Sequence, residues 1–313
     1  MKICSSLRTP FACRLPVVLA AVVFFAACGP RGYEAPITKF HDASATVIES
    51  ARVYFSELNK VERDSYILAQ ASSRAPIDPR RISRVQVFSQ EGLQARLEAL
   101  DVLEAYGALL LQLAKSNSPE KIRGETTDLK GSLEALSGTV SGLTHQDDRA
   151  FRNAVGPVLT IVGEVLDLVI QHKIQEALDS AIEGGEAPIN DLVKLLRRDI
   201  NLAYQRKRTA LSAIRLALVD DYNRETQKGP KADPDKLRTY AERIRAQEDR
   251  WETFNNSNPG EGLDAMAKAH SALVEFAESD KKKSSFQDLV AAMEDFAARA
   301  KRVGEAVQAL RDK

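Results

Sequence analysis

Apolar residues recur at alternating steps of three and four along most of this 313-residue chain. One such stripe runs along residues 37–72, and another runs from Ser284 to the end of the chain. The first stripe consists of Ile37, Phe40, Ser44, Val47, Ala51, Tyr54, Leu58, Val61, Ser65 and Leu68. This spacing puts the side chains on one side of an α-helix, which must be buried against another helix. The spacing therefore predicts an all-α protein.

Helix-forming residues dominate between these stripes, while proline and glycine mark the connections. We find no run of alternating Val, Ile and Thr that is long enough to predict a strand. Ser118-Pro119, Asp233-Pro234 and Asn258-Pro259 are typical helix starts, and Gly184-Gly185 and Gly229-Pro230 are expected to end helices. The predicted helices cover about 37–72, 86–115, 119–143, 146–183, 188–227, 234–254, 259–278 and 284 onward.

Short connections between long amphipathic helices imply antiparallel neighbours. The sequence thus predicts an elongated antiparallel helical bundle whose long helices are heptad-patterned and coiled-coil-like. The break at 228–233 predicts a main helical bundle over 37–230 and a C-terminal helical subdomain over 231–313. No fixed-period repeat is evident, which disfavours a solenoid.

The N-terminal segment has the layout of a targeting signal. Three basic residues and no acidic residue lie in residues 1–14, and the stretch Leu15–Ala27 is apolar. A membrane-spanning helix needs about 20 apolar residues, so this stretch is too short to span a bilayer but fits a signal peptide. Its end, Phe25-Ala26-Ala27-Cys28, resembles the lipobox of bacterial lipoprotein precursors, with Phe25 where that family usually has Leu.

The resemblance implies a signal peptide over 1–27 and a lipid, such as palmitate with diacylglycerol, on Cys28. Residues 28–36 then form the lipidated cysteine and a tether that reaches at most about 28 Å. Gly29 favours the outer membrane over the inner one, so the expected location is the cell envelope, anchored to the membrane and facing the periplasm. The alternative is an ordinary cleaved signal peptide without a lipid.

Charge and cysteine content exclude several classes of function. The chain has 44 basic and 44 acidic residues, which gives no electrostatic footprint for nucleic acid. After cleavage only Cys28 would remain of the three cysteines, so no disulfide or cysteine metal cluster is expected. The four histidines lie in no zinc or di-iron motif, and no phosphate-binding loop or nucleophile motif is present, so we predict no cofactor and no metal.

Two sets of polar residues are candidate sites. Lys194, Arg197, Arg208 and Arg215 line one face of the helix over 188–227; this face is either solvated or a contact for phosphate headgroups or an acidic partner. Thr160, Glu164, Asp167 and Gln171 form a polar stripe on the most apolar helix, which is predicted to be the centre of the core. Lys207, in the apolar row of its helix, either extends to the surface or pairs with Glu164 or Asp167.

The leading hypothesis is a lipid-anchored, non-enzymatic envelope protein that acts through protein–protein contacts of its helix faces. A first alternative is a carrier of lipid or another apolar ligand, with a cavity along the helix over 155–170. A second alternative is a hydrolase, because an apolar setting would raise the pKa values of Glu164 and Asp167.

Overall fold

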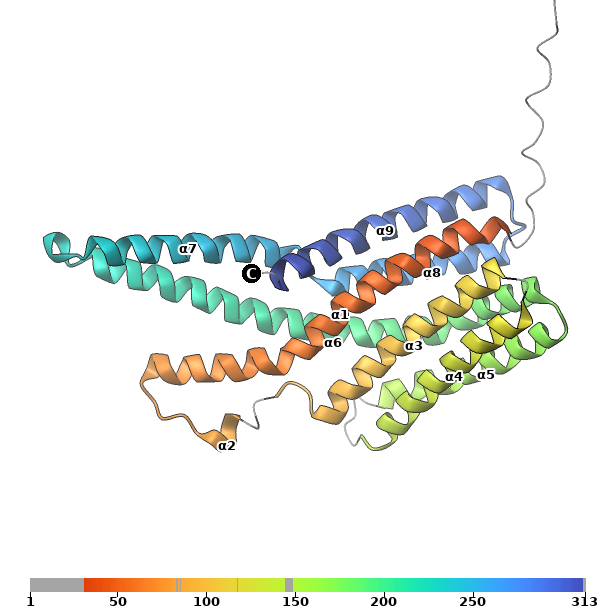
Figure 1. The fold of residues 1–313 in the computed structure, drawn as a ribbon, viewed down its shortest axis with the longest axis horizontal. Helices are drawn as coiled ribbons and strands as arrows, with labels where there is room; N and C mark the ends of the chain where they lie inside the picture. The colour runs from red at the N-terminus through yellow and green to blue at the C-terminus, as the bar shows by residue number, and fades with distance from the viewer. Residues whose placement is uncertain (1–30, 83, 85, 117, 144–148, 312–313) are drawn as a thin grey trace, which may run out of the picture.

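The computed structural model describes residues 31–311, apart from 83, 85, 117 and 144–148 (Figure 1). Within these ranges the chain is all-α and contains no strand, as the sequence predicted. The elements are α1 (Arg31–Ser73), α2 (Pro79–Ile82), α3 (Gln90–Lys115), α4 (Pro119–Ser141), α5 (Arg149–Ile170), α6 (Ile174–Thr226), the 3-10 turn η2 (Gly229–Lys231), α7 (Pro234–Asn255), α8 (Pro259–Glu278) and α9 (Lys283–Arg311). No helix in the described ranges is long and apolar enough to cross a membrane.

Two helices organise the packing. The long α6 contacts α1, α3, α5, α7 and α8, and α1 contacts α3, α6, α8 and α9. The buried residues of α8 and α9 belong to the same continuous hydrophobic cluster as those of α1, α3 and α6. The predicted boundary at residue 230 therefore does not separate two hydrophobic cores.

The first helix begins earlier than the sequence suggested. α1 starts at Arg31, so Arg31–Pro36 is helical and the predicted tether over 28–36 is wrong for these residues. Tyr33 explains the difference, because its ring is buried against Phe276 at 5.1 Å between centroids and its hydroxyl donates to Asp179 Oδ1 at 2.9 Å. These contacts fix the start of α1 beside the start of α6.

The helix that was predicted to run over 146–183 ends earlier, at Ile170. α5 ends at Ile170, the chain turns at His172 with φ of 61°, and α6 then runs straight through Gly184 and Gly185. A Cβ on Gly185 would lie 2.5 Å from the Tyr106 hydroxyl oxygen. The absence of a side chain at Gly185 therefore lets Tyr106 of α3 pack closely against α6.

α5 is an outer helix and not the centre of the core. It packs between α4 and α6, and it buries one row of valines against them. The buried row is Val155, Val158, Val162, Val165 and Val169. Because the opposite side of α5 is exposed, its high apolar content reflects a wide buried face and does not indicate burial all round.

A hydrogen-bonded group joins α3, α6 and α8 inside the core. The Tyr106 hydroxyl donates to the Ala181 carbonyl at 3.1 Å and lies 2.7 Å from His270 Nε2. Since the hydroxyl hydrogen is used on Ala181, Nε2 carries the proton that the hydroxyl oxygen accepts. The buried His270 Nδ1 then has no hydrogen-bond partner among the described residues. Burial lowers the pKa of His270 to about 4.

A buried ion pair also joins α3 to α6. Arg96 and Asp199 are 2% and 3% exposed, and Arg96 Nη2 lies 2.6 Å from Asp199 Oδ2. The guanidinium also donates to the Gly92 carbonyl and stacks 3.7 Å from the Phe88 ring centroid. A charge pair placed so deeply fixes the register of the two helices, because either charge alone would be costly to bury.

Candidate interaction arm

The second half of α6, η2 and α7 form a long hairpin, residues 205–253, which we call the arm (Figure 1). α7 runs back along α6 and reaches the body again at its end. Of the residues in α7, only Phe254 is buried. The other apolar side chains at heptad spacing are half-buried: Leu237, Tyr240, Ile244 and Trp251. Two helices alone cover only one side of each other, so most of the arm's surface is open to solvent.

Aromatic rings fix the root of the arm to the body. Tyr204 of α6 stacks on Phe254 of α7, with 4.6 Å between ring centroids and 10° between planes. Tyr54 of α1 lies 6.5 Å from the Tyr204 ring, and its hydroxyl is hydrogen-bonded to Ser257 Oγ. Burial raises the pKa of Tyr54, which therefore stays a neutral hydrogen-bonding group. The arm therefore leaves the body in a fixed direction.

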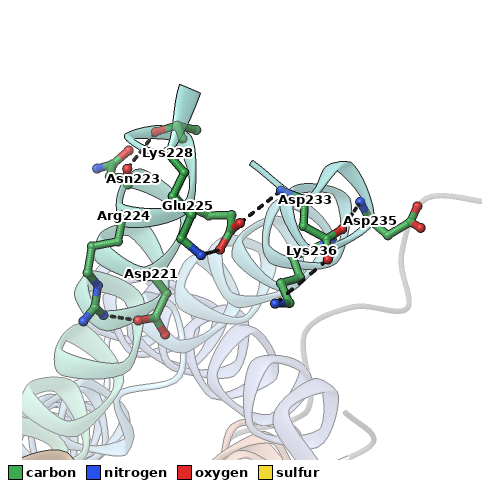
Figure 2. Close-up of polar contacts among 9 residues, drawn as sticks. Asp221, Asn223, Arg224, Glu225, Lys228, Asp233, Asp235 and Lys236 are labelled. Carbon is green, nitrogen blue, oxygen red and sulfur yellow. Dashed lines mark hydrogen bonds and ion pairs between the residues drawn. The ribbon is translucent and has the colours of Figure 1, made fainter. Parts of the chain in front are cut away.

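Polar contacts close the tip of the arm, residues 225–236 (Figure 2). The Glu225 carboxylate accepts from Lys228 Nζ at 2.7 Å and from the Asp233 backbone N–H at 3.0 Å. The Asp233 side chain accepts from the backbone N–H groups of Asp235 and Lys236, and so caps α7 as its Asp-Pro start predicted. The bonds from Lys228 and Asp233 lower the pKa of Glu225. The tip is a structural turn whose polar groups are engaged with one another.

One side of α6 is left exposed from Leu202, just before the arm, to Leu216 within it. Leu202, Gln205, Thr209, Ala213 and Leu216 are all exposed, and we call this row the outer stripe. Leu202 is 41% and Leu216 63% exposed, although their helix packs on five others. The stripe lies away from the seam with α7, where Leu211 and Leu218 are buried. Leu202, Ala213 and Leu216 therefore expose apolar surface that the described residues leave uncovered.

The four basic residues of α6 do not share one open face. Arg197 pairs with Asp264 of α8, and Arg215 makes two bonds with Glu248 of α7 at 2.9 and 2.7 Å. The other two are a local pair between Lys194 and Asp191 at 3.3 Å and Arg208 Cζ 5.9 Å from the Trp251 ring centroid. Three of the four charges are thus balanced by carboxylates of the chain itself.

Lys207 binds a different helix from the one expected. Its ammonium lies 2.8 Å from Glu57 Oε2 and 5.1 Å from the Tyr54 ring centroid, both on α1. The side chain is 14% exposed. Both predictions, extension to the surface and pairing with Glu164 or Asp167, are therefore wrong.

The polar stripe on α5 faces solvent. Thr160, Glu164, Asp167 and Gln171 are all exposed, and Thr160 Oγ1 donates to the Gly156 carbonyl at 3.4 Å. Glu164 and Asp167 therefore do not lie in the apolar setting on which the hydrolase alternative depended. The structural premise of the hydrolase alternative is therefore wrong.

The predicted cavity along 155–170 has no counterpart at the buried valines, because Val158, Val162 and Val165 lie in the continuous core. An open groove of about 830 Å³ lies elsewhere, over α1, α9 and the end of α3. Its lining alternates small residues such as Ala43 and Gly304 with charged residues. No large aliphatic or aromatic side chain lines this groove, unlike the hydrophobic and aromatic lining that is typical of a lipid-binding site.

The described ranges contain no group of three or more His, Cys, Asp or Glu residues placed to hold a metal ion. Cys28, and with it the predicted lipobox and signal peptide, lies outside the described residues. The sequence analysis did not predict the outer stripe. Leu202 and Leu216 lie off the apolar seam of their helix, and this position in the sequence could have indicated that they are exposed. Comparison of the chain with protein-family models, curated proteins and solved structures found no match.

Proposed function

We propose that this protein is a non-enzymatic, lipid-anchored component of the bacterial cell envelope that binds a protein through its arm. The observation that carries the proposal is the uncovered outer stripe of α6. Its apolar members Leu202, Ala213 and Leu216 lie on one side of a long helix, and exposed apolar residues arranged in this way are typical of a surface that receives another helix. We also propose that the long helices of the chain itself pair in antiparallel, coiled-coil-like fashion.

The geometry suits a contact made at a distance from the membrane. Tyr33 and Asp179 hold the start of α1 beside the start of α6, and α1 begins three residues after Cys28. From Asp179 to the end of α6 at Thr226 a helix spans about 70 Å at 1.5 Å per residue. A lipid on Cys28 would therefore keep one end of the body near the headgroups while the arm projects away from the bilayer.

The anchor is tested by labelling with radioactive palmitate. The full chain should be labelled in a bacterial host, and the Cys28→Ser variant should not be. An unlabelled wild-type chain would contradict the anchor and leave the arm's function to be tested separately.

The arm's function is tested by photo-crosslinking in membranes. A photoreactive amino acid at Leu216 should give a discrete crosslinked species, whereas the same group at Thr160, exposed on α5, should not. A chain that forms no crosslink at Leu216 or at the other positions of the outer stripe does not use the arm as proposed.

A further inference from the structure

A basic connection joins α1 to α3, and the proposed function makes no use of it. Residues 65–90 contain four basic residues and one acidic residue, Asp78, which leaves three net positive charges. We call residues 74–86 of this connection the arginine loop. Its basic residues are all exposed: Arg74, Arg80, Arg81 and Arg84. On a chain whose net charge is zero, such a loop forms a local positive patch.

Contacts with α1 hold the arginine loop in a defined shape. The Asp78 backbone N–H donates to the Tyr66 hydroxyl oxygen at 3.1 Å, and Asp78 Oδ1 accepts from the Arg80 backbone N–H at 2.9 Å. Just after the loop, the Val87 backbone N–H donates to Asn59 Oδ1 at 3.1 Å. A segment fixed in this way loses less conformational entropy on binding than a free chain does.

The guanidinium of Arg81 is oriented by an aromatic ring. Its Cζ lies over the Tyr66 ring, 5.2 Å from the centroid. The five N–H donors of a guanidinium lie in one plane, and their fork matches the two oxygens of a carboxylate. Stacking on a ring leaves these in-plane donors open to a partner. A lysine at this position would keep the charge but lose the fork.

The charges of the arginine loop are not neutralised from within the chain. Among the residues that the structure describes, none of its four arginines forms an ion pair. Carboxylates on the last part of α1 pair with other cations, Asp64 with Arg63 and Glu62 with Arg206. Ile77, which lies between the arginines in the chain, is 45% exposed. The loop thus combines guanidinium groups with an exposed apolar side chain.

We propose that the arginine loop is a second interaction surface, which binds an acidic segment of another protein. Carboxylates of that segment pair with the guanidinium groups, and an apolar residue of it packs on Ile77. The arginine loop shares no residue with the outer stripe of α6, so the inference goes beyond the proposed function.

An acidic protein fits this loop better than the anionic headgroups of the anchoring bilayer. Headgroups also attract arginine side chains, but only near the membrane surface. α1 measures about 63 Å along its axis from Arg31 to Ser73, and the arginine loop follows its far end (Figure 1). An anchor at the start of α1 would therefore keep the loop away from the bilayer, so the choice of a protein rests on the proposed anchor.

Fluorescence anisotropy of a labelled peptide tests the binding with the purified full chain. The probe is a synthetic peptide in which one leucine is flanked on each side by three glutamates, and a second peptide has glutamine in place of glutamate. The wild-type chain should bind the glutamate peptide at least tenfold more tightly than the glutamine peptide, and added salt should weaken this binding. A chain without this preference overturns the inference.

Charge reversal locates the binding. The double variant Arg80→Glu with Arg84→Glu should keep wild-type helicity by circular dichroism, because both side chains are exposed, and should bind the glutamate peptide at least tenfold more weakly. Arg123→Glu, exposed on α4, is the matched control and should bind as wild type does. An equal loss in Arg123→Glu would mean that the peptide senses only the overall charge, which overturns the inference.

Arg81→Lys separates an oriented site from general attraction between charges. It should weaken binding of the glutamate peptide at least threefold, and unchanged binding overturns the inference. Vesicles of phosphatidylglycerol that bind the wild-type chain but not the double variant would assign the loop to a bilayer and overturn the choice of a protein. None of these outcomes affects the crosslink at Leu216, which tests the arm separately.

Discussion

Acidification should weaken the fold through His270. Its imidazole is buried between α3, α6 and α8, with Nε2 against the Tyr106 hydroxyl and Nδ1 facing no acceptor among the described residues. Protonation would place a positive charge and a second N–H donor in this site, and neither would be stabilised. The folded protein therefore holds His270 neutral, with a pKa of about 4 against an ordinary value of 6.5.

The magnitude follows from the two pKa values. The unfolded chain binds this proton more readily, so the free energy of unfolding is highest above pH 6.5 and falls as the pH falls toward 4. The full difference corresponds to about 3 kcal/mol, and about 2 kcal/mol is already lost at pH 5. Such a loss is a large part of the stability of a typical domain.

Urea unfolding followed by circular dichroism between pH 7.5 and pH 4.5 measures this effect. His270→Gln keeps a neutral hydrogen-bonding side chain, so it should be less stable than wild type at pH 7.5 but should lose about 2 kcal/mol less on acidification to pH 5. His172→Asn, at an exposed turn, is the matched control and should follow wild type. Curves of equal slope for wild type and His270→Gln would refute the reasoning, because the acid sensitivity would then come from other groups.

Three further predictions concern the other internal contacts. Asp199→Asn removes the buried carboxylate charge that pairs with Arg96 and should lower the free energy of unfolding by about 3–5 kcal/mol, whereas Asp264→Asn, in a half-exposed pair, should lower it by less than about 1 kcal/mol, both measured in urea. Gly185→Ala forces a methyl group against the buried Tyr106 hydroxyl and should lower the free energy of unfolding in urea by about 1–3 kcal/mol. An unchanged free energy of unfolding would mean that α3 and α6 can move apart at this point without cost. Glu225→Gln should speed amide hydrogen exchange in the arm's tip without affecting the body. Because the folded-state pKa of Glu225 is lowered, wild-type protection there should be present above its ordinary value of 4.5 and fade as the pH falls below it.

Local signals fixed most of the secondary structure. The Asp233-Pro234 and Asn258-Pro259 starts correctly predicted α7 and α8, because capping depends on residues adjacent in the chain. The heptad stripe of α1 correctly identified its buried side as far as Leu58. Beyond that point the same pattern continues to Leu68, which is 52% exposed, since the helix there runs past its neighbours.

The candidate site depended on contacts between distant parts of the chain. Gly184-Gly185 reads locally as a helix end, but α6 runs through it, with Ile161 of α5 packed against Gly184 and Tyr106 of α3 against Gly185. Glu164 and Asp167 lie in an apolar sequence, yet solvent reaches them because α5 is at the outside of the bundle. Neither outcome can be read from neighbours in sequence.

The sequence by itself determined that this chain is helical, where most of its helices begin, and that its net charge is close to zero. Helix propensity, capping and charge depend on individual residues and their neighbours in the chain. The predicted signal peptide and lipid anchor rest on the sequence as well and await the labelling test. Only the tertiary structure decided which apolar rows are buried, that His270 faces Tyr106, and that the outer stripe of α6 is left exposed by the described residues. Burial is a relation between helices far apart in the chain, and a periodic pattern gives the side of a helix that can be buried without giving the helix that covers it.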